Sequence, residues 1–127
     1  PLFAKKAKEN RLNKIAADFE TNIIEGEIEY SKNKGKYYYK SIDNRRFDLT
    51  MAAEGVKQIG IIPLLIRTGK ITEGTILFLD EPDNNLNPLA ISKLIKTLFA
   101  LAAEGIQIFI STHNHLLSQY ISLYNEY

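Results

Sequence analysis

The stretch TILFLDEPDNNLNP, residues 75–88, runs from five mostly apolar residues into two adjacent carboxylates, Asp80 and Glu81. Residues 75–79 predict a short strand, and because apolar and polar residues do not alternate in it, we expect both of its faces to be covered. Asn87 is placed to cap a following helix with Pro88 at its first position, where a missing N–H costs nothing. The stretch therefore predicts a buried strand that ends in acid and a helix that begins soon afterwards.

The next elements along the chain complete a unit around this strand. The helix that begins at Pro88 has one apolar face and ends at Gly105. The residues of that face are Ile91, Leu94, Ile95, Leu98 and Ala102. A second apolar run, IQIFI at residues 106–110, predicts another strand and is followed by STHNH. Strand, helix and strand in this order predict a βαβ unit with two parallel strands, and hence an α/β fold.

Three elements are expected ahead of this unit. Residues 2–24 carry apolar residues at helical spacing, namely Leu12, Ile15, Ala16, Phe19 and Ile23. GEIEY and KYYYKSI, residues 26–30 and 36–42, flank a turn at 33–35 and predict a β-hairpin. Residues 52–68 predict a deeply buried helix, which Pro63 should kink or break and Gly69 should end.

The composition excludes several classes of protein. The chain of 127 residues is long enough for one domain with a core and has 16 basic and 15 acidic residues, so its charge balance gives no general attraction to nucleic acid or to an anionic membrane. It has no cysteine, which excludes disulfides and thiolate metal sites and fits a cytoplasmic protein. No apolar run approaches the roughly 20 residues of a membrane helix.

Two local features leave nucleic-acid binding open. Residues 5–14 carry five Lys or Arg side chains and one Glu, and a basic helix can contact nucleic acid, although a solvated helix face is the simpler interpretation. Tyr37, Tyr38 and Tyr39 could form a platform on which bases stack. A hairpin with one face on a core explains the tyrosines equally well.

The polar residues of the βαβ unit are expected to meet at one edge of the sheet. Ligands of open α/β sheets bind at the carboxyl ends of the strands, where Asp80-Glu81 and 111–113 both lie. Because parallel strands point the same way, Glu81 and His113 should lie one or two strand spacings of about 4.8 Å apart. A carboxylate there suits Mg²⁺, a second one can orient or deprotonate a water, and a histidine can stabilise a developing anionic oxygen.

Each polar cluster taken alone has a simpler interpretation. An Asp-Glu pair at a strand end is usually a solvated turn, and a lone histidine is more often structural. His113 and His115 could suggest a metal pair, but no third His, Cys or carboxylate lies nearby in sequence, which argues against zinc. The presence of both clusters on one βαβ unit, in this order, favours a shared active site.

With these motifs the chain resembles ATPases with an ABC-type head, in particular the AAA-type branch related to the OLD and SMC-like proteins. ILFLDEP resembles the Walker B strand, which implies that Asp80 binds Mg²⁺ and that Glu81 polarises the attacking water. FISTH resembles the switch-histidine strand, which makes His113 the sensor of the γ-phosphate of ATP. The resemblance covers about residues 50–115.

Two further motifs carry the resemblance across a dimer interface. DNNLNP occupies the place of the D-loop, which implies that Asn84, Asn85 and Asn87 face a second copy of the ATPase head. TMAAEGVKQIG, residues 50–60, resembles the ABC signature, which implies that Glu54 and Gly55 face ATP held by the partner. The serine and paired glycines common in ABC transporters are absent from this signature.

The sequence lacks a phosphate-binding P-loop. That loop needs G-x-x-x-x-G-K-[ST], and neither Gly35-Lys36 nor Gly69-Lys70 has the first glycine or the final hydroxyl. In the family this loop lies in an N-terminal lobe, so we expect the chain to be the C-terminal lobe of a longer P-loop ATPase that is inactive on its own. Residues 1–51 would supply a helix and a hairpin to this lobe, and residues 52–127 its ATPase core.

The resemblance implies an ATP-binding, Mg²⁺-dependent ATPase that works as a head-to-head dimer, in DNA maintenance or in defence against foreign DNA, with a nuclease as a possible partner. One alternative is a module with a degenerate core that binds DNA or protein without hydrolysis. Another is a Mg²⁺-dependent nuclease that uses Asp80, Glu81 and Asp83. It would need a further acidic residue at another strand end, and the sequence offers none with that placement.

Overall fold

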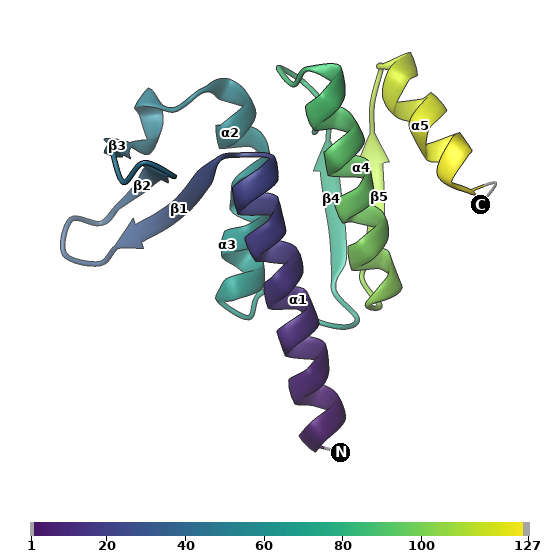
Figure 1. Ribbon diagram of the computed structural model, residues 1–127, viewed down its shortest axis with the longest axis horizontal. Coiled ribbons are helices and arrows are strands. Elements are labelled where there is room, and N and C mark those ends of the chain that lie inside the picture. Colours follow the sequence, from purple (N-terminus) through teal and green to yellow (C-terminus); the bar gives the residue numbers. More distant parts are fainter. Residues whose placement is uncertain (1, 126–127) are drawn as a thin grey trace.

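The computed structural model describes residues 2–125, which form a mixed α/β fold with one sheet on each side of a long central helix (Figure 1). The elements are α1 (Leu2–Asn22), β1 (Gly26–Ser31), β2 (Lys36–Ser41), β3 (Arg46–Asp48), the 3-10 helix η1 (Leu49–Met51), α2 (Glu54–Ile59), α3 (Ile61–Arg67), β4 (Ile76–Asp80), α4 (Pro88–Ala103), β5 (Gln107–Ser111) and α5 (His115–Asn125). Strands β1, β2 and β3 form an antiparallel sheet, and β4 and β5 form a parallel pair. The predicted helix at 2–24, the hairpin and the βαβ unit are confirmed.

The core is built around α1. Leu12, Ala16 and Phe19, spaced by four and three residues, are buried and pack against α3 and α4. Ile15 and Ile23 lie at the margin of the same face and are partly buried. None of the helices within residues 2–125 combines the length and the apolar character needed to cross a bilayer.

The buried helix predicted over residues 52–68 is interrupted at Gly60, not at Pro63. A Cβ at Gly60 would come within 2.5 Å of the Val56 carbonyl oxygen and 2.6 Å of the Ile28 side chain, so only glycine fits there. Pro63 lies in the first turn of α3, where its missing N–H leaves little unsatisfied. The close packing of β1 on the junction of α2 and α3 therefore decides where the chain bends.

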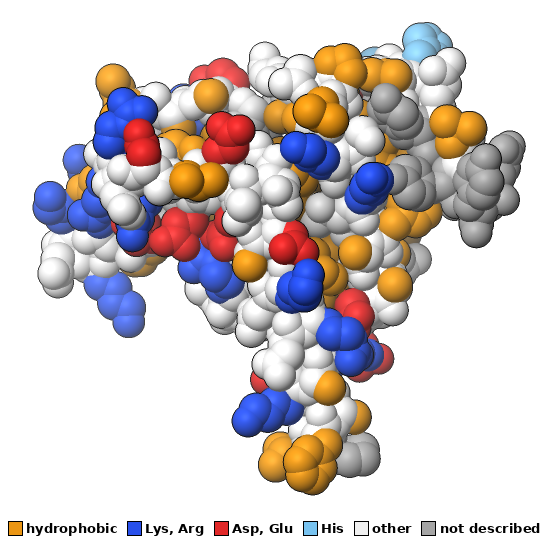
Figure 2. Space-filling view, viewed as in Figure 1, with side chains coloured by type: hydrophobic (Ala, Val, Ile, Leu, Met, Phe, Trp, Pro, Cys, Tyr) orange, Lys and Arg blue, Asp and Glu red, His pale blue; other side chains and the backbone are white. Residues whose placement is uncertain are grey.

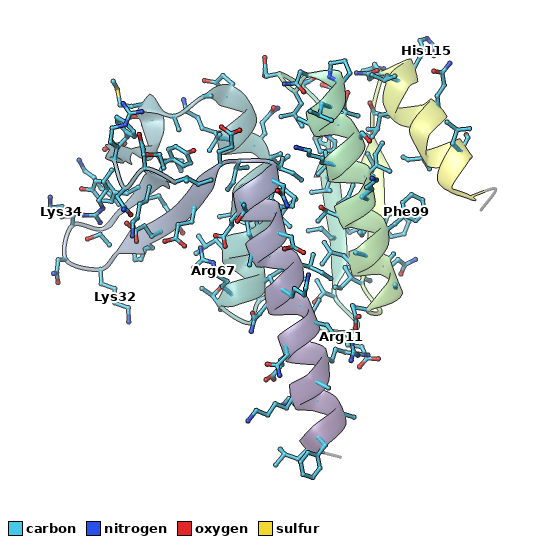
Figure 3. All side chains as sticks on the ribbon, viewed as in Figure 1. Arg11, Lys32, Lys34, Arg67, Phe99 and His115 are labelled. Carbon is cyan, nitrogen blue, oxygen red and sulfur yellow. The ribbon has the colours of Figure 1, made fainter. Side chains whose placement is uncertain are left out.

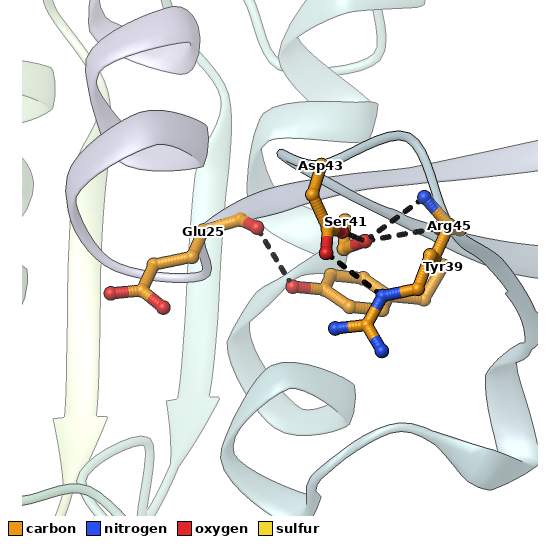
Figure 4. A network of polar contacts seen from close by, with 5 residues as sticks. All are labelled: Glu25, Tyr39, Ser41, Asp43 and Arg45. Atoms are coloured by element: carbon orange, nitrogen blue, oxygen red, sulfur yellow. Dashed lines mark hydrogen bonds and ion pairs between the residues drawn. The ribbon is translucent and has the colours of Figure 1, made fainter.

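The antiparallel sheet is anchored to the core by one of its faces. Ile28 pairs with Tyr39, and Tyr39 pairs with Phe47, so these three side chains share a face. Ile28 is buried, and the Tyr39 hydroxyl lies within hydrogen-bond distance of the carbonyl oxygen of Ile24, at 2.7 Å. It also lies 2.9 Å from the carbonyl oxygen of Glu25, a contact that Figure 4 shows. Tyr39 is therefore an anchor and cannot serve as a stacking platform.

The third strand of this sheet, β3, was not predicted, because three residues of mixed character give no periodic signal. It is set by the turn that precedes it, in which the Ser41 hydroxyl and the Arg45 guanidinium both donate to Asp43 (Figure 4). These contacts, led by the Ser41 hydrogen bond, lower the pKa of Asp43. Asn44 takes a positive φ of 66° in this turn, which asparagine tolerates well.

An ion pair joins α1, α3 and β1. The Arg67 guanidinium donates to a Glu20 carboxylate oxygen at 2.9 Å and to the Ile28 carbonyl oxygen at 3.0 Å, and it lies 3.8 Å from Glu27. The pKa of Glu20 is raised above its ordinary value of 4.5, mainly because burial disfavours the charged carboxylate and Arg67 only partly offsets this. Ionisation of Glu20 is therefore a net cost to the folded chain.

We expect Glu20→Gln to change the free energy of unfolding at pH 7 by less than about 1 kcal/mol, because Arg67 keeps its contacts with Ile28 and Glu27. A group whose pKa is higher in the folded chain adds stability below its unfolded pKa, and that stability is lost as the pH rises through the folded pKa. The glutamine variant should therefore gain on the wild type as the pH rises above 4.5, in urea unfolding at a series of pH values. A loss of about 3 kcal/mol at pH 7 would show instead that the ion pair outweighs the cost of burial.

The predicted βαβ unit is confirmed in its order and direction. The Asn87 side chain accepts a hydrogen bond from the Ala90 N–H at 2.8 Å and caps α4, and Gly105, with φ of 92°, follows its end. Four of the five residues predicted for the inner face of α4 are buried. Ala102 is exposed, and Leu101, which is fully buried, takes its place because α4 turns this residue toward α1 and β5.

The prediction that both faces of the first parallel strand are covered is wrong for this chain. Leu77 and Leu79 pack against the core, but Phe78 on the opposite face is 74% exposed and Phe109 of β5 is 47% exposed. The two rings stack with centroids 5.1 Å apart, and the exposed side chain of Ile76 lies on the same face of β4. The uniform apolar sequence predicts two covered faces, whereas residues 2–125 cover only the one that faces α4.

Candidate functional site

The carboxyl ends of β4 and β5 bring the two predicted polar clusters together. Asp80 is paired with Ser111 across the parallel strands, and the Ser111 hydroxyl donates a hydrogen bond to the Asp80 carboxylate. Both side chains lie on the exposed face of the pair, in line with Phe78 and Phe109. The Asp80 carboxylate is therefore held in place and open to a ligand.

Glu81 is fixed by the elements on either side of it. Its N–H donates to the Ser111 carbonyl oxygen at 2.7 Å, which extends the ladder of β4 and β5 by one residue. The Asn84 amide donates to one carboxylate oxygen at 3.0 Å, and His113 Nε2 lies 3.5 Å from the other. The backbone of Glu81 has a φ of 47°, a left-handed conformation that is costly for a residue with a side chain. In this backbone conformation the Glu81 side chain reaches His113, which follows the end of β5.

His113 is held through its neighbours in sequence. Its side chain is 95% exposed, so it is free to meet a ligand. Thr112 donates from its hydroxyl to the buried carboxylate of Asp83 at 3.0 Å and accepts from the Asn114 N–H at 3.0 Å. The Asn114 side chain in turn accepts from the Leu116 N–H in the first turn of α5. The loop that carries His113 is thus tied both to the segment after β4 and to α5.

The signature-like segment lies against the D-loop-like segment. Gly55 is buried, and a Cβ there would come within 2.8 Å of the Leu86 side chain and 3.2 Å of the Asn85 carbonyl oxygen. Glu54 pairs with Lys57 at 3.0 Å on the exposed side of α2. Two motifs that are 30 residues apart in the sequence therefore share one surface of the fold.

The predicted site residues fall into two groups. Asp80, Glu81 and His113 meet at one sheet edge, with Asn84 in contact with Glu81. The remaining residues, Glu54, Gly55, Asn85 and Asn87, lie along the neighbouring surface of α2 and the turn before α4, and the Asn87 side chain serves as the cap of α4. Asn85, with φ of 63°, is exposed in that turn.

The residues at this edge suit a Mg²⁺ ion that also binds waters and phosphates. They do not suit a metal ion that protein side chains would have to hold alone. Within residues 2–125 no group of three His, Cys, Asp or Glu side chains is placed to hold a metal by itself. Mg²⁺ is usually held by one or two carboxylates together with waters and phosphates, and Asp80 with the Ser111 hydroxyl offers oxygen ligands of this kind. Asp83 is buried and bonded to Thr112, so it does not complete the acidic triad that a nuclease would need.

Ser111 and Thr112 were expected at this edge, and Asp83 was named only in the nuclease alternative, but none of the three was predicted to hold another residue of the site in place. The register of the parallel strands could have revealed Ser111, because equal strand lengths place it beside Asp80. No sequence signal pairs Thr112 with Asp83, since their contact depends on how the turn after β4 folds back.

Comparisons with known proteins show which sequences this chain resembles. The family described as "AAA domain, putative AbiEii toxin, Type IV TA system" matches residues 2–118. The energy-coupling factor transporter ATP-binding protein EcfA of Methanococcus maripaludis is 46% identical over 39 residues, which are 31% of this chain and 14% of that protein. The chain thus spans a small part of the length of this relative. Because the family match extends over most of the chain, the chain belongs to this AAA-domain family.

Proposed function

We propose that the chain is the C-terminal lobe of an ABC-type ATPase of the OLD and SMC-like branch, and that Glu81 and His113 act on the γ-phosphate of ATP. The observation that carries the proposal is the Glu81–His113 pair, held 3.5 Å apart at the carboxyl edge of a parallel sheet beside Asp80. A solvated turn would not account for the contact that joins Glu81 to His113, a residue from the end of another strand.

Each residue at this edge has a part in the proposed reaction. Asp80 and Ser111 would hold Mg²⁺, which neutralises charge on the phosphate oxygens when it is bound. Glu81 accepts a proton from, or orients, the water that attacks the γ-phosphate in line, and Asn84 keeps its carboxylate in place. His113 donates a hydrogen bond to a γ-phosphate oxygen as negative charge develops there.

The proposed ATPase needs a second lobe that carries the Walker A loop. The exposed face of β4 and β5 is where this lobe would pack, because Phe78 and Phe109 offer apolar area and Asp80 lies at the end of the same face. A lobe seated there would bring its phosphate loop beside Asp80. In this arrangement residues 1–51 and 52–127 together form one lobe, which alone binds ATP poorly and does not hydrolyse it.

The second surface, formed by Glu54, Asn85 and their neighbours around the buried Gly55, would face another copy of the ATPase head. Its support is the contact between the signature-like and D-loop-like segments, which places both on one side of the fold. In a head-to-head dimer this surface would close over ATP held by the partner, with Glu54 and Gly55 nearest to the phosphates.

The process driven by hydrolysis is proposed from the resemblance to the OLD and SMC-like branch. We assign the ATPase to DNA maintenance or defence in the cytoplasm, with DNA and a nuclease as partners. A module that binds DNA or protein without hydrolysis is the second candidate. The exposed basic turn between β1 and β2 favours this second candidate. The contact between Glu81 and His113 argues against it, because a module that only binds needs neither side chain.

The test joins the chain to its upstream Walker A lobe and measures ATP turnover with Mg²⁺. We expect turnover by the joined protein and none by the 127-residue chain alone. Hydrolysis by the isolated chain would contradict the need for a second lobe. If the joined protein bound DNA but did not hydrolyse ATP, the binding module would be the better description.

The same experiment, with the two lobes as separate chains, tests the docking face. Phe78→Ser with Phe109→Ser should weaken association by about tenfold or more, because stacked apolar rings at the centre of an interface carry much of its binding energy. Phe3→Ser with Leu123→Ser is the matched control, since both side chains are exposed on other elements. Equal loss in both pairs of variants would argue against this face as the docking surface.

A further inference from the structure

The tip of the β1–β2 hairpin presents a pair of exposed aromatic rings. Tyr30 and Tyr37 are directly paired across the two strands, with ring centroids 4.9 Å apart and planes at 52°. They are 50% and 43% exposed, although they share the face on which Ile28 is buried in the core. The anchored half of the sheet accounts for Ile28 and Tyr39, but the core does not reach the two rings at the tip.

The other aromatic side chains of this sheet are engaged within the chain. Tyr38, on the opposite face, lies under the Arg46 guanidinium at 4.0 Å and the Lys34 ammonium at 5.7 Å. Tyr39 is the anchor described above. Tyr30 and Tyr37 are therefore the tyrosines of the hairpin with ring surface left for a ligand.

The same tip carries the positive charge of the sheet that no carboxylate neutralises. All four carboxylates of residues 26–48 lie within 4 Å of a cation, and the pairs are Glu27–Arg67, Glu29–Arg46, Asp43–Arg45 and Asp48–Lys36. Within residues 2–125, Lys32 and Lys34 have no carboxylate partner, and Figure 3 shows both at the tip. The contact of Lys34 is with the ring of Tyr38, which leaves its charge unneutralised. Figure 2 shows basic side chains gathered on this end of the molecule.

The basic helix α1 does not offer an equivalent surface. Lys8, Arg11 and Lys14 pair with Glu73, Glu104 and Asp18 at distances of 2.8, 2.8 and 3.1 Å. These contacts neutralise three of the five basic side chains that made α1 a candidate for nucleic-acid binding. Lys5 and Lys6 keep their charge a short way along α1 from the exposed ring of Phe3, whereas the hairpin tip combines two unpaired lysines with two facing tyrosine rings.

We propose that the hairpin tip binds single-stranded nucleic acid, with a base stacked on Tyr30 and Tyr37 and the phosphates beside Lys32 and Lys34. Aromatic rings next to lysines form the combination by which single strands are bound without sequence preference, since every base has a face that can stack. A duplex hides its base faces and offers the tip only phosphate contacts. The proposal concerns binding in the absence of nucleotide and does not rest on the proposed ATPase activity.

The test uses the 127-residue chain and fluorescence anisotropy of a labelled oligo(dT) of about 15 nucleotides at low salt. Tyr30→Leu with Tyr37→Leu removes the rings but keeps apolar bulk on the strands, and we expect it to weaken oligo(dT) binding about tenfold while binding of polyphosphate is unchanged. Lys32→Gln with Lys34→Gln should weaken both ligands and reduce the salt dependence of binding. Lys5→Gln with Lys6→Gln removes the same charge from α1 and should leave both affinities near those of the wild type.

Several outcomes would overturn the proposal. These are no binding of oligo(dT) by the wild type, equal affinity of the wild type and the leucine variant, or a loss in the α1 variant as large as in the hairpin variants. Tighter binding of a duplex of the same length would also contradict it, because stacking on the rings would then contribute nothing. Thermal unfolding of each variant shows whether the fold is kept, and Tyr37→Phe, which retains the ring, should bind like the wild type.

Discussion

Glu81→Gln should lower the ATP turnover of the assembled ATPase by about 10²- to 10⁴-fold while nucleotide binding is kept. Glutamine has the shape of glutamate and can still accept the hydrogen bond from Asn84, so the local fold is preserved. It cannot accept a proton from water, and it loses the charge that orients the water toward phosphorus. The chemical step should therefore fail while ATP still binds between the lobes.

Turnover at saturating ATP, measured together with ATP binding, separates these two effects. Asp18→Asn is a matched control, since it removes one carboxylate from the exposed side of α1, far along the chain from the site. The assignment of Glu81 would be wrong if the glutamine variant hydrolysed ATP at the rate of the wild type. A loss of ATP binding comparable to the loss of turnover would show that Glu81 holds nucleotide and has no separate part in the chemistry.

Phe19→Ala should reduce the free energy of unfolding by about 3–5 kcal/mol. Phe19 is 1% exposed and lies where α1 meets α3 and α4. Removal of its ring therefore leaves a cavity that the three helices cannot fill by shifting toward one another. Chemical denaturation followed by circular dichroism would measure the loss. A loss of this size is a large part of the total stability of an ordinary domain.

The same helix supplies the control for this variant. Phe3→Ala makes the same chemical change at a residue that is 89% exposed, and it should alter stability by no more than about 0.5 kcal/mol. If Phe19→Ala lost no more stability than Phe3→Ala, the buried ring of Phe19 would contribute nothing measurable to the core. The packing of α1 on α3 and α4 would then not be what holds the two sheets together.

The sequence was most informative where periodicity, caps and breakers agree. The apolar spacing of α1, the Asn87 cap of α4 and Gly105 at its end each have a local physical cause, and all are found in the structure. The helix break was predicted at Pro63 and lies at Gly60, because it depends on the contact of Gly60 with Ile28, a residue 32 positions earlier. Burial of β4 was overestimated because composition shows that a face is apolar but not what covers it.

The edge where the candidate site lies was predictable from topology alone. Parallel strands must end on the same side, so Glu81 and His113 could be placed together from their positions after two strands. The contacts that hold Glu81 and His113 could not be predicted in this way. The hydrogen bond from Thr112 to Asp83 and the positive φ of Glu81 both depend on how the turn after β4 folds. The sequence pattern thus located the candidate site residues, and the tertiary structure showed which groups hold them in place.

The uncovered face of β4 and β5 also sets the electrostatic environment of Asp80. While Phe78 and Phe109 face solvent, the carboxylate beside them is surrounded by water, whose high dielectric constant weakens every charge interaction. A lobe packed on the rings would remove that water and lower the local dielectric, so the attraction between Asp80 and a cation would strengthen at the moment of assembly. The same two phenylalanines that offer a docking surface would thereby make the strength of cation binding at Asp80 depend on the arrival of the second lobe.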